Sequence, residues 1–181
     1  MRQKLKNLTQ AQTIALGFFI VILMGTLLLM LPISSKNGQS IGFIPALFTS
    51  ASASCVTGLV VVDTYTHWST FGQIVIITLI QIGGLGFITL GVLFSLLLNR
   101  NINLKQRTLI RESVNSIHIG GVVKLVKKII IGTFAIELIG AVIMSFFFIP
   151  ELGFTRGVYY SVFHSISAFC NAGFDLMGYR G

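Results

Sequence analysis

Charge is what this 181-residue chain has least of, since charged residues make up 10% of it and the acidic side chains number five. A soluble domain typically carries about 25% charged residues, so too few are present to cover the surface of a globule. Cysteine is also scarce. Cys55 and Cys170 are too few for a disulfide framework, and the sequence favours small, buried residues at both positions. The low charge and the 54% hydrophobic content exclude an ordinary soluble protein.

Three long apolar runs predict membrane-spanning helices. Residues 7–35 and 69–99 contain no charge, and residues 129–150 contain one, Glu137. About 20 apolar residues cross a bilayer, so each run is long enough. Residues 13–31 exceed the apolar region of a cleavable signal, and no small-residue cleavage site follows. We therefore expect a multi-pass protein of the cell membrane, in which Glu137 is favoured as a structural hydrogen-bonding group over an ion-path group.

The basic residues predict the orientation of the chain. Ten of the 13 lie before the first run or between the second and the third. Because cytoplasmic loops are enriched in Lys and Arg, the N-terminus and residues 100–128 are expected in the cytoplasm, and residues 34–68 and 151–181 outside. The net charge of +8 could indicate nucleic acid, but this placement argues for membrane lipid as the partner and against nucleic acid.

A shorter apolar segment, residues 43–54, lies between the first two runs. As a helix it would be roughly 18 Å long, which is too short for about 30 Å of hydrocarbon. From this segment alone two interpretations stay open. One is a helix lying on the outer surface. The other is a re-entrant half-helix followed by non-helical backbone, which is tolerated at membrane depth only when it is buried in protein or lines a wet cavity.

An internal repeat favours the re-entrant interpretation. Residues 42–59 align without a gap with residues 157–174, and seven of the 18 positions are identical, including Gly58 and Gly173 just beyond the helices. The C-terminal end of a half-helix is partially negative, and glycine lets a carbonyl point inward. Cation filters are built from rings of such carbonyls. The lack of a carboxylate ring favours a monovalent cation over Ca²⁺ or Mg²⁺.

The pattern predicts an all-α integral membrane fold of repeated units, each with an outer helix, a re-entrant pore helix, a filter loop and an inner helix. The first unit spans 1–100, with outer helix 13–33, pore helix 43–55, filter 56–59 and inner helix 70–98. A cytoplasmic linker helix is expected at 101–120. An incomplete second unit spans 121–181, with outer helix 122–149, pore helix 157–170 and filter 171–174. Pro32 and Pro150 are expected to end the two outer helices. The expected ion-binding carbonyls are those of Val56, Thr57, Gly58, Asn171, Ala172 and Gly173.

Several ordered motifs cover nearly the whole chain. They are LPIS at 31–34, ALFT at 46–49, VTGL at 56–59, VVDT at 61–64, LIQIGGLGF at 79–87, FH at 163–164, ISAF at 166–169 and NAGF at 171–174. In these motifs the chain resembles the membrane subunit of the Trk/Ktr/HKT potassium transporters, and most closely the bacterial Ktr type. Cys55 and Cys170 stand where Thr and Asn are common in that family, a change that coordination by backbone should tolerate.

The resemblance implies four such repeats around one pore, with a filter glycine in each as the mark of potassium permeation. It implies K⁺ as the transported ion, with Na⁺ assisting uptake, and no organic cofactor. It also implies a homodimer and a cytosolic nucleotide-binding ring that gates the pore. Because the chain stops at Gly181, just past the second filter, it looks truncated. We expect it to be a fragment of a longer product or to need other copies to complete a ring.

Two functions follow from these observations. The first is channel-like, passive potassium uptake across the bacterial plasma membrane, since no nucleotide-hydrolysing motif is present. The alternative is a membrane scaffold or inactive fragment whose cytoplasmic helix recruits a cytosolic partner through Arg107 and Arg111. An enzyme is not expected, because His67, His118 and His164 fall in different compartments or depths. His164 is interpreted as a packed, hydrogen-bonded core residue.

Overall fold

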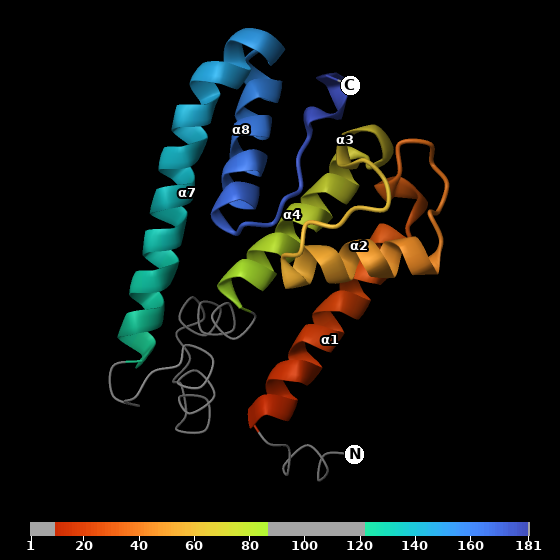
Figure 1. Cartoon of the computed structure of the whole chain (residues 1–181), viewed down its shortest axis with the longest axis vertical. Coiled ribbons are helices and arrows are strands. Elements are labelled where there is room, and N and C mark those ends of the chain that lie inside the picture. Colours follow the sequence, from red (N-terminus) through yellow and green to blue (C-terminus); the bar gives the residue numbers. More distant parts are fainter. Residues whose placement is uncertain (1–9, 87–121, 181) are drawn as a thin grey trace.

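The computed structural model describes residues 10–86 and 122–180, and Figure 1 shows the whole chain. The longer helices are α1 (Gln10–Leu29), α2 (Phe43–Cys55), α4 (Thr70–Leu85), α7 (Val122–Leu152) and α8 (Phe154–Phe169). Three short ones are η2 (Pro32–Ser34), α3 (Thr64–His67) and η3 (Met177–Arg180). Within the described ranges there is no strand, and Ser35 and Trp68 form one isolated β-bridge. The expected all-helical class is confirmed.

Two of these helices are long and apolar enough to cross a membrane. The apolar windows are Gln12–Leu29 and Val123–Leu152, each with a mean hydropathy of 2.2. Phe146 and Phe147 on α7 are 75% and 74% exposed, which a lipid environment would accept and water would not. The apolar helices α2 and α4 are shorter, with 13 and 16 residues.

The two prolines do not end the long helices as predicted. Pro150 lies inside α7, which continues to Leu152, so the expected end at residue 149 is wrong. A proline this close to the end removes one helical hydrogen bond only, and the Gly153 N–H restores the pattern by donating to the Ile149 carbonyl at 2.9 Å. At the first site α1 has already ended at Leu29, and Pro32 opens the short helix η2, where its missing N–H costs nothing.

Two further helix boundaries differ from the sequence expectation. Helix α8 starts at Phe154 rather than at residue 157, because Gly153 with φ 79° takes the N-cap position. Gly157 lies inside α8, and a Cβ there would meet the backbone of Ile149. Helix α4 ends at Leu85 where an inner helix to residue 98 was expected. Gly86 adopts φ 76°, a break the sequence analysis did not predict, and residues 87–98 lie outside the described part.

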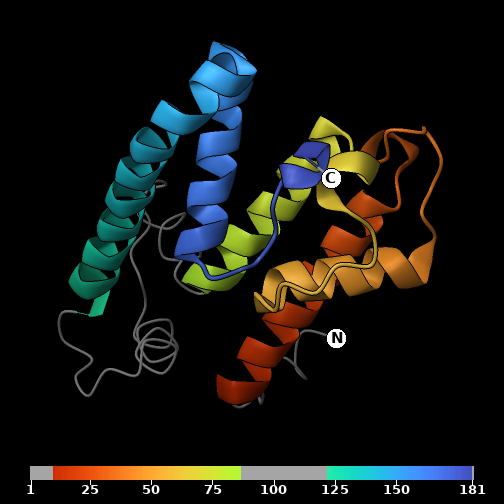
Figure 2. The ribbon, with the colours of Figure 1, turned by 45° about the horizontal axis from the view of Figure 1, so that its top comes forward.

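The helices form two pairs that meet at α4 (Figures 1 and 2). Helices α7 and α8 run antiparallel, side by side, and α2 lies across α1. Each short helix, α2 and α8, is followed by an extended segment that returns along it, toward α3 in one case and η3 in the other. Helix α4 contacts α1, α2 and α8, so it joins the two pairs.

The same contact recurs in both helix pairs. The Ser50 hydroxyl on α2 donates to the Ile22 carbonyl on α1 at 2.7 Å, and the Ser165 hydroxyl on α8 donates to the Glu137 carbonyl on α7 at 2.6 Å. A glycine faces each serine, since a Cβ on Gly25 would collide with Ser50 Oγ and one on Gly140 would collide with Ser165 Oγ.

These contacts keep the spacing of the sequence repeat. Positions 22 and 137, 25 and 140, and 50 and 165 are each 115 residues apart. The contacts therefore extend to the long helices an offset that the sequence showed only in residues 42–59 and 157–174. A small residue on one helix and a hydroxyl on the other allow the two helices to approach closely. Such contacts are important inside a membrane, because the hydrophobic effect does not drive helices together there.

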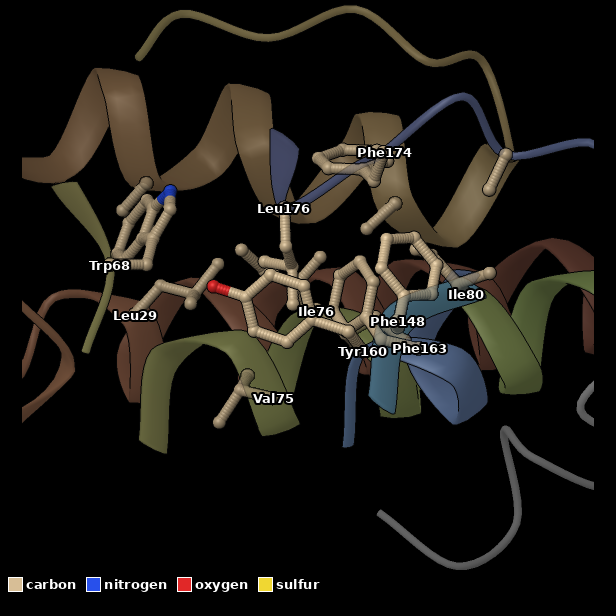
Figure 3. Packing of buried hydrophobic residues seen from close by; sticks show 14 residues of the cluster. Leu29, Trp68, Val75, Ile76, Ile80, Phe148, Tyr160, Phe163, Phe174 and Leu176 are labelled. Carbon is tan, nitrogen blue, oxygen red and sulfur yellow. The ribbon is translucent and has the colours of Figure 1, made fainter. Parts of the chain in front are cut away.

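One apolar cluster joins the two halves of the described chain (Figure 3). Trp68 and Ile76 come from the first half and Phe163 from the second, and all three are at most 2% exposed. Gln73 crosses the same boundary. Its side-chain amide donates to the Trp68 carbonyl at 3.1 Å, and its Oε1 accepts a hydrogen bond from the Tyr159 hydroxyl at 3.0 Å. Both ends of this buried amide are paired, as stability requires.

A second polar contact lies between α4 and α7. Glu137 is 5% exposed, and its Oε1 accepts a hydrogen bond from Gln81 Nε2 at 2.9 Å. This agrees with the expected hydrogen-bonding role of the residue. A buried acidic group without a partner is costly, so Glu137 should keep its contact with Gln81. This contact holds α7 and α4 in one position relative to each other.

We expect Gly140→Val to destabilise the pairing of α7 with α8. The added side chain displaces the Ser165 hydroxyl and breaks its hydrogen bond to the Glu137 carbonyl. Overpacking of this kind costs about 1–3 kcal/mol. The measurement is thermal unfolding of the detergent-purified protein. Gly132→Val is the matched control on the same helix, since a Cβ at Gly132 meets nothing within 4 Å. Equal melting temperatures for the two variants would contradict the prediction.

Removal of the Glu137 side chain should weaken the contact between α4 and α7. Glu137→Ala leaves the buried Gln81 amide without its acceptor, at a cost of about 1–3 kcal/mol. Glu137→Gln keeps an acceptor oxygen at the same place and should retain most of the stability. Resistance of purified protein to unfolding by detergent or heat distinguishes the two. The idea fails if the Gln variant is as unstable as the Ala variant.

Candidate functional site

The two segments that follow α2 and α8 share an unusual backbone. We call residues 56–59 the first loop and residues 171–174 the second loop. Val56 and Gly58 have φ of 57° and 75°, and Asn171 and Gly173 have φ of 57° and 72°. The residue between each pair is not in the left-handed region. A left-handed valine is rare because the branched side chain crowds the backbone, so this geometry is imposed by its surroundings.

The first N–H groups of each loop are bonded to the helix they leave. The Val56 and Thr57 N–H groups donate to the carbonyls of Ala53 at 3.3 Å and Ser52 at 3.0 Å. In the second loop the Asn171 and Ala172 N–H groups donate to Ala168 at 3.0 Å and Ser167 at 2.7 Å. These bonds satisfy the helix ends in the way a left-handed cap does. They also take the loop N–H groups away from any ligand.

The loop carbonyls are in the opposite situation. In the part of the chain that the structure describes, no hydrogen bond is accepted by the backbone oxygens of Val56, Thr57, Gly58, Asn171, Ala172 or Gly173. Alternation of left- and right-handed residues can gather either N–H groups or carbonyls on one side of a chain. Among these six residues of the described chain, four N–H groups are bonded to the helix ends and all six carbonyls are free, so the groups offered to a ligand are mainly oxygens. The six expected ion-binding residues therefore lie in two matching, carbonyl-bearing loops.

The two loops lie against one another. A Cβ built on Gly58 would be 2.8 Å from the Ala172 carbonyl oxygen and 3.3 Å from the Gly173 Cα. A Cβ on Gly173 would be 3.2 Å from the Gly58 Cα. Neither glycine leaves room for a side chain, and both have a positive φ that L-residues rarely adopt. Close backbone approach therefore explains both glycines in local physical terms.

A glycine pair on α4 supports the ends of α2 and α8. A Cβ on Gly83 would collide with the Ser54 carbonyl oxygen at the end of α2, and one on Gly84 would collide with Cys170 Sγ at the end of α8. Two consecutive glycines thus each accept a helix end from a different half. The sequence interpretation of residues 83–86 as a place of close backbone approach is confirmed. The Ser54 hydroxyl is buried there without a partner.

Two side chains of α8 hold the segment that returns from the second loop. The Ser167 hydroxyl donates to the Phe174 carbonyl at 2.6 Å. The Leu176 N–H donates to His164 Nε2 at 3.1 Å, so the proton of the neutral ring lies on Nδ1, which is 2.8 Å from the Tyr160 carbonyl. His164 is thus packed and bonded through both nitrogens, as expected. A cavity of about 310 Å³ lies here, lined in part by Asn171 and Gly173.

Two carboxylates lie just beyond the loops. Asp63 accepts a hydrogen bond from the Thr66 N–H at 2.6 Å, and Asp175 accepts one from the Met177 N–H at 2.7 Å. The nearby His67 is uncharged at neutral pH because burial lowers the pKa of its imidazole. Lys36 brings a positive charge to the same side, since its Nζ lies 4.0 Å from the centre of the Tyr65 ring. Each half thus contributes one carboxylate just beyond its loop.

Other expected residues are placed differently or lie outside the described part. Cys55 is exposed and Cys170 is half-buried, so the expected burial is wrong for Cys55, whose side of α2 no described element covers. Arg107 and Arg111 lie in the segment 87–121, outside the described residues. Among the described residues no group of three or more His, Cys, Asp or Glu could hold a metal ion. Sequence reasoning missed the side-chain contacts between helix and loop, Ser167 with Phe174 and Ser52 with Thr57.

The chain is similar to known cation transport proteins along nearly its whole length. The family model for TrkH, described as a cation transport protein, matches residues 2–179. The chain is 48% identical over 173 residues to the potassium/sodium uptake protein NtpJ of Enterococcus hirae, covering 96% of this chain and 38% of that protein.

Two relatives come from Bacillus subtilis. Ktr system potassium uptake protein B is 52% identical over 168 residues, which cover 93% of this chain and 37% of that protein. Ktr system potassium uptake protein D is 38% identical over 175 residues, or 96% and 39%. The chain thus spans less than two fifths of the length of these relatives. The family match covers almost the entire sequence. We conclude that this chain belongs to the TrkH family of cation transport proteins, which includes membrane transporters of the Ktr type.

Proposed function

We propose that this chain supplies part of a channel-like pore for potassium uptake across the bacterial plasma membrane. The first and second loops contribute backbone oxygens of Val56, Thr57 and Gly58, and of Asn171, Ala172 and Gly173, to a selectivity filter. Helices α2 and α8 are its pore helices, α1 and α7 are outer helices, and α4 is an inner helix. Each half is then one repeat of a larger ring, so the oxygens of further repeats complete the ion's coordination.

The observation that carries this proposal is the same in both loops: the N–H groups of the first two residues are bonded to the helix end, and the carbonyls are free within the described chain. A dehydrated monovalent cation needs several oxygens at once, and backbone carbonyls provide them without a full negative charge that would bind too tightly to release. The same φ alternation recurs at residues 56–58 and 171–173, and Gly58 lies against Gly173, so carbonyls of both loops are available in one region.

The charge of the surroundings favours a cation in the same place. The C-terminal ends of α2 and α8 carry the partially negative ends of their helix dipoles, and both lie directly before the loops. Asp63 and Asp175 add two carboxylates on the side where the returning segments lie. We propose the orientation that the basic residues predict, with the N-terminus and the segment 100–128 in the cytoplasm. The two carboxylates then face outward, where they raise the local concentration of cations.

The names of the relatives support a choice of transported ion and of partner proteins. NtpJ is named for potassium and sodium uptake, and the two Bacillus subtilis proteins for potassium uptake in a Ktr system. We propose K⁺ as the main substrate, with Na⁺ as a second ion. A Ktr system implies further components, and we propose that a homodimer in membrane lipid is regulated by a cytosolic nucleotide-binding ring. The scaffold alternative is not favoured, since these relatives are named for the uptake of potassium or sodium.

Gly58→Asp tests the filter. The new side chain would lie against the Ala172 carbonyl and bring a negative charge among the coordinating oxygens. We expect a roughly tenfold or greater loss of selective K⁺ uptake, because the filter geometry cannot accept a side chain at this φ. The measurement is uptake of K⁺ or Rb⁺ by bacteria lacking their own potassium uptake systems, with the gene product expressed at its full natural length.

Gly38→Asp is the matched control. Gly38 also has a positive φ, 68°, but a Cβ there meets nothing within 4 Å, and the residue is exposed in the turn before α2. This variant should take up K⁺ like the wild type. If Gly58→Asp, expressed at the same level, still takes up K⁺ with unchanged selectivity over Na⁺, the assignment of the first loop to the filter is wrong.

A further inference from the structure

The backbone of the two loops is alike, but different side chains hold it. At the end of the second loop, the Phe174 carbonyl accepts the Ser167 hydroxyl at 2.6 Å, and both residues are buried. The equivalent carbonyl of the first loop, at Leu59, accepts no hydrogen bond within the described residues. The second loop therefore has three free carbonyls, at 171–173, before one that is tied back to α8. The first loop has four free carbonyls, at 56–59.

The serine equivalent to Ser167 has another partner. Ser52 lies 115 positions earlier, and its hydroxyl accepts a hydrogen bond from Thr57 Oγ1 at 2.9 Å. Residue 172, which corresponds to Thr57, is an alanine and has no hydroxyl to give. In the first loop this serine is bonded to a threonine of the loop itself, whereas in the second loop the equivalent serine bonds the carbonyl of residue 174.

The residue one turn earlier on each helix shows the same division. His164 on α8 accepts the Leu176 N–H, and so holds the returning segment two residues beyond the Ser167 contact. Thr49 is its equivalent on α2, and its hydroxyl donates to the Pro45 carbonyl within its own helix at 2.9 Å. Two side chains of α8 therefore hold the second loop and the segment that follows it. The first loop is instead held by its own Thr57.

We propose that Ser167 and Thr57 are positioning residues that set the selectivity of the filter by these different means. Ser167 withdraws the Phe174 carbonyl, so the row of free oxygens in the second loop ends at Gly173. Thr57 anchors the first loop to Ser52 from within, and its carbonyl row continues to Leu59. The inference rests on the proposed function of the loops as a filter, and it adds which side chains fix their oxygens.

The physical consequence concerns discrimination between ions of different size. K⁺ and Na⁺ differ in the distance at which oxygens must be held, so a carbonyl free to turn relaxes the preference for the larger ion. Without the Ser167 hydroxyl, the Phe174 carbonyl loses a short hydrogen bond and can rotate toward the other oxygens. Selectivity should then fall while the protein still folds, because replacing the serine hydroxyl by hydrogen removes little packing volume.

Ser167→Ala is the first test, with Ser161→Ala as its control. Ser161 is a buried serine on the same helix, and its hydroxyl only donates to the Gly157 carbonyl four residues back. In full-length protein we expect a roughly fivefold fall in the ratio of K⁺ to Na⁺ uptake for Ser167→Ala, the change that one net hydrogen bond corresponds to. Ser161→Ala should leave the ratio unchanged, and Ser167→Thr, which keeps the hydroxyl, should restore it.

The first loop is tested by a double-mutant cycle. Thr57→Val keeps the shape of the side chain and removes its hydroxyl, and Ser52→Ala removes the acceptor. Because the two changes delete one shared interaction, their effects on the K⁺ to Na⁺ ratio should not add, and the double variant should match either single one. Ser54→Ala is the control, since Ser54 is buried on the same helix without a partner.

The outcomes separate this inference from the proposed function. If Gly58→Asp abolishes selective uptake but Ser167→Ala and Thr57→Val behave like their controls, the loops form the filter and the positioning role is wrong. If Gly58→Asp itself leaves uptake selective, the filter assignment fails first. A fall in thermal stability of Ser167→Ala beyond that of Ser161→Ala, with an unchanged ion ratio, would make Ser167 a structural residue only and overturn the proposal.

Discussion

Both helix pairs of the described fold depend on one contact. In each pair a short helix lies close enough to a long one for a serine hydroxyl to reach a backbone carbonyl. The two instances, Ser50 with Ile22 and Ser165 with Glu137, set the depth of α2 and α8. Each requires a glycine on the long helix, because a side chain there would occupy the place of the hydroxyl. Inside a membrane, packing and hydrogen bonds of this kind replace the hydrophobic effect as the force between helices. The loops are where they are because these helices end where they do.

The position of the helix ends then determines which backbone groups are free. A helix terminates with carbonyls that lack partners, and the first N–H groups of each loop fold back onto them. This closes the helix and removes the first two donors of each loop, so carbonyls are the main free groups. The consecutive glycines of α4, at 83 and 84, let both ends approach one helix and meet each other. One rule of backbone hydrogen bonding thus produces a segment rich in free carbonyls twice in one chain.

Much of this was predictable from sequence, and the limits have physical reasons. The apolar runs and the 115-residue offset predicted the helices and both loops, because bilayer thickness and repetition leave few alternatives. Pro150 was misjudged, since a proline in the last turn removes too little hydrogen bonding to end a helix. Left-handed backbone at Val56 and Asn171 was not predicted: it is tolerable for asparagine but rare for valine, so local preference does not indicate that the two positions share it. Contacts such as Ser167 with Phe174 depend on which helix face meets the returning segment, which spacing does not specify.

The differences between the two halves indicate which groups of the loops the site depends on. The φ angles agree within a few degrees at 56 and 171, and at 58 and 173, although the residues at the first pair are a valine and an asparagine. The side chains that enforce those dihedrals differ completely: a threonine within one loop, and a serine and a histidine outside the other. If side chains bound the ion, they would be the feature shared by the halves. The backbone is shared and the supports are not, which supports the proposal that the carbonyls are the ligand groups and that the supporting hydroxyls give the two loops distinct roles.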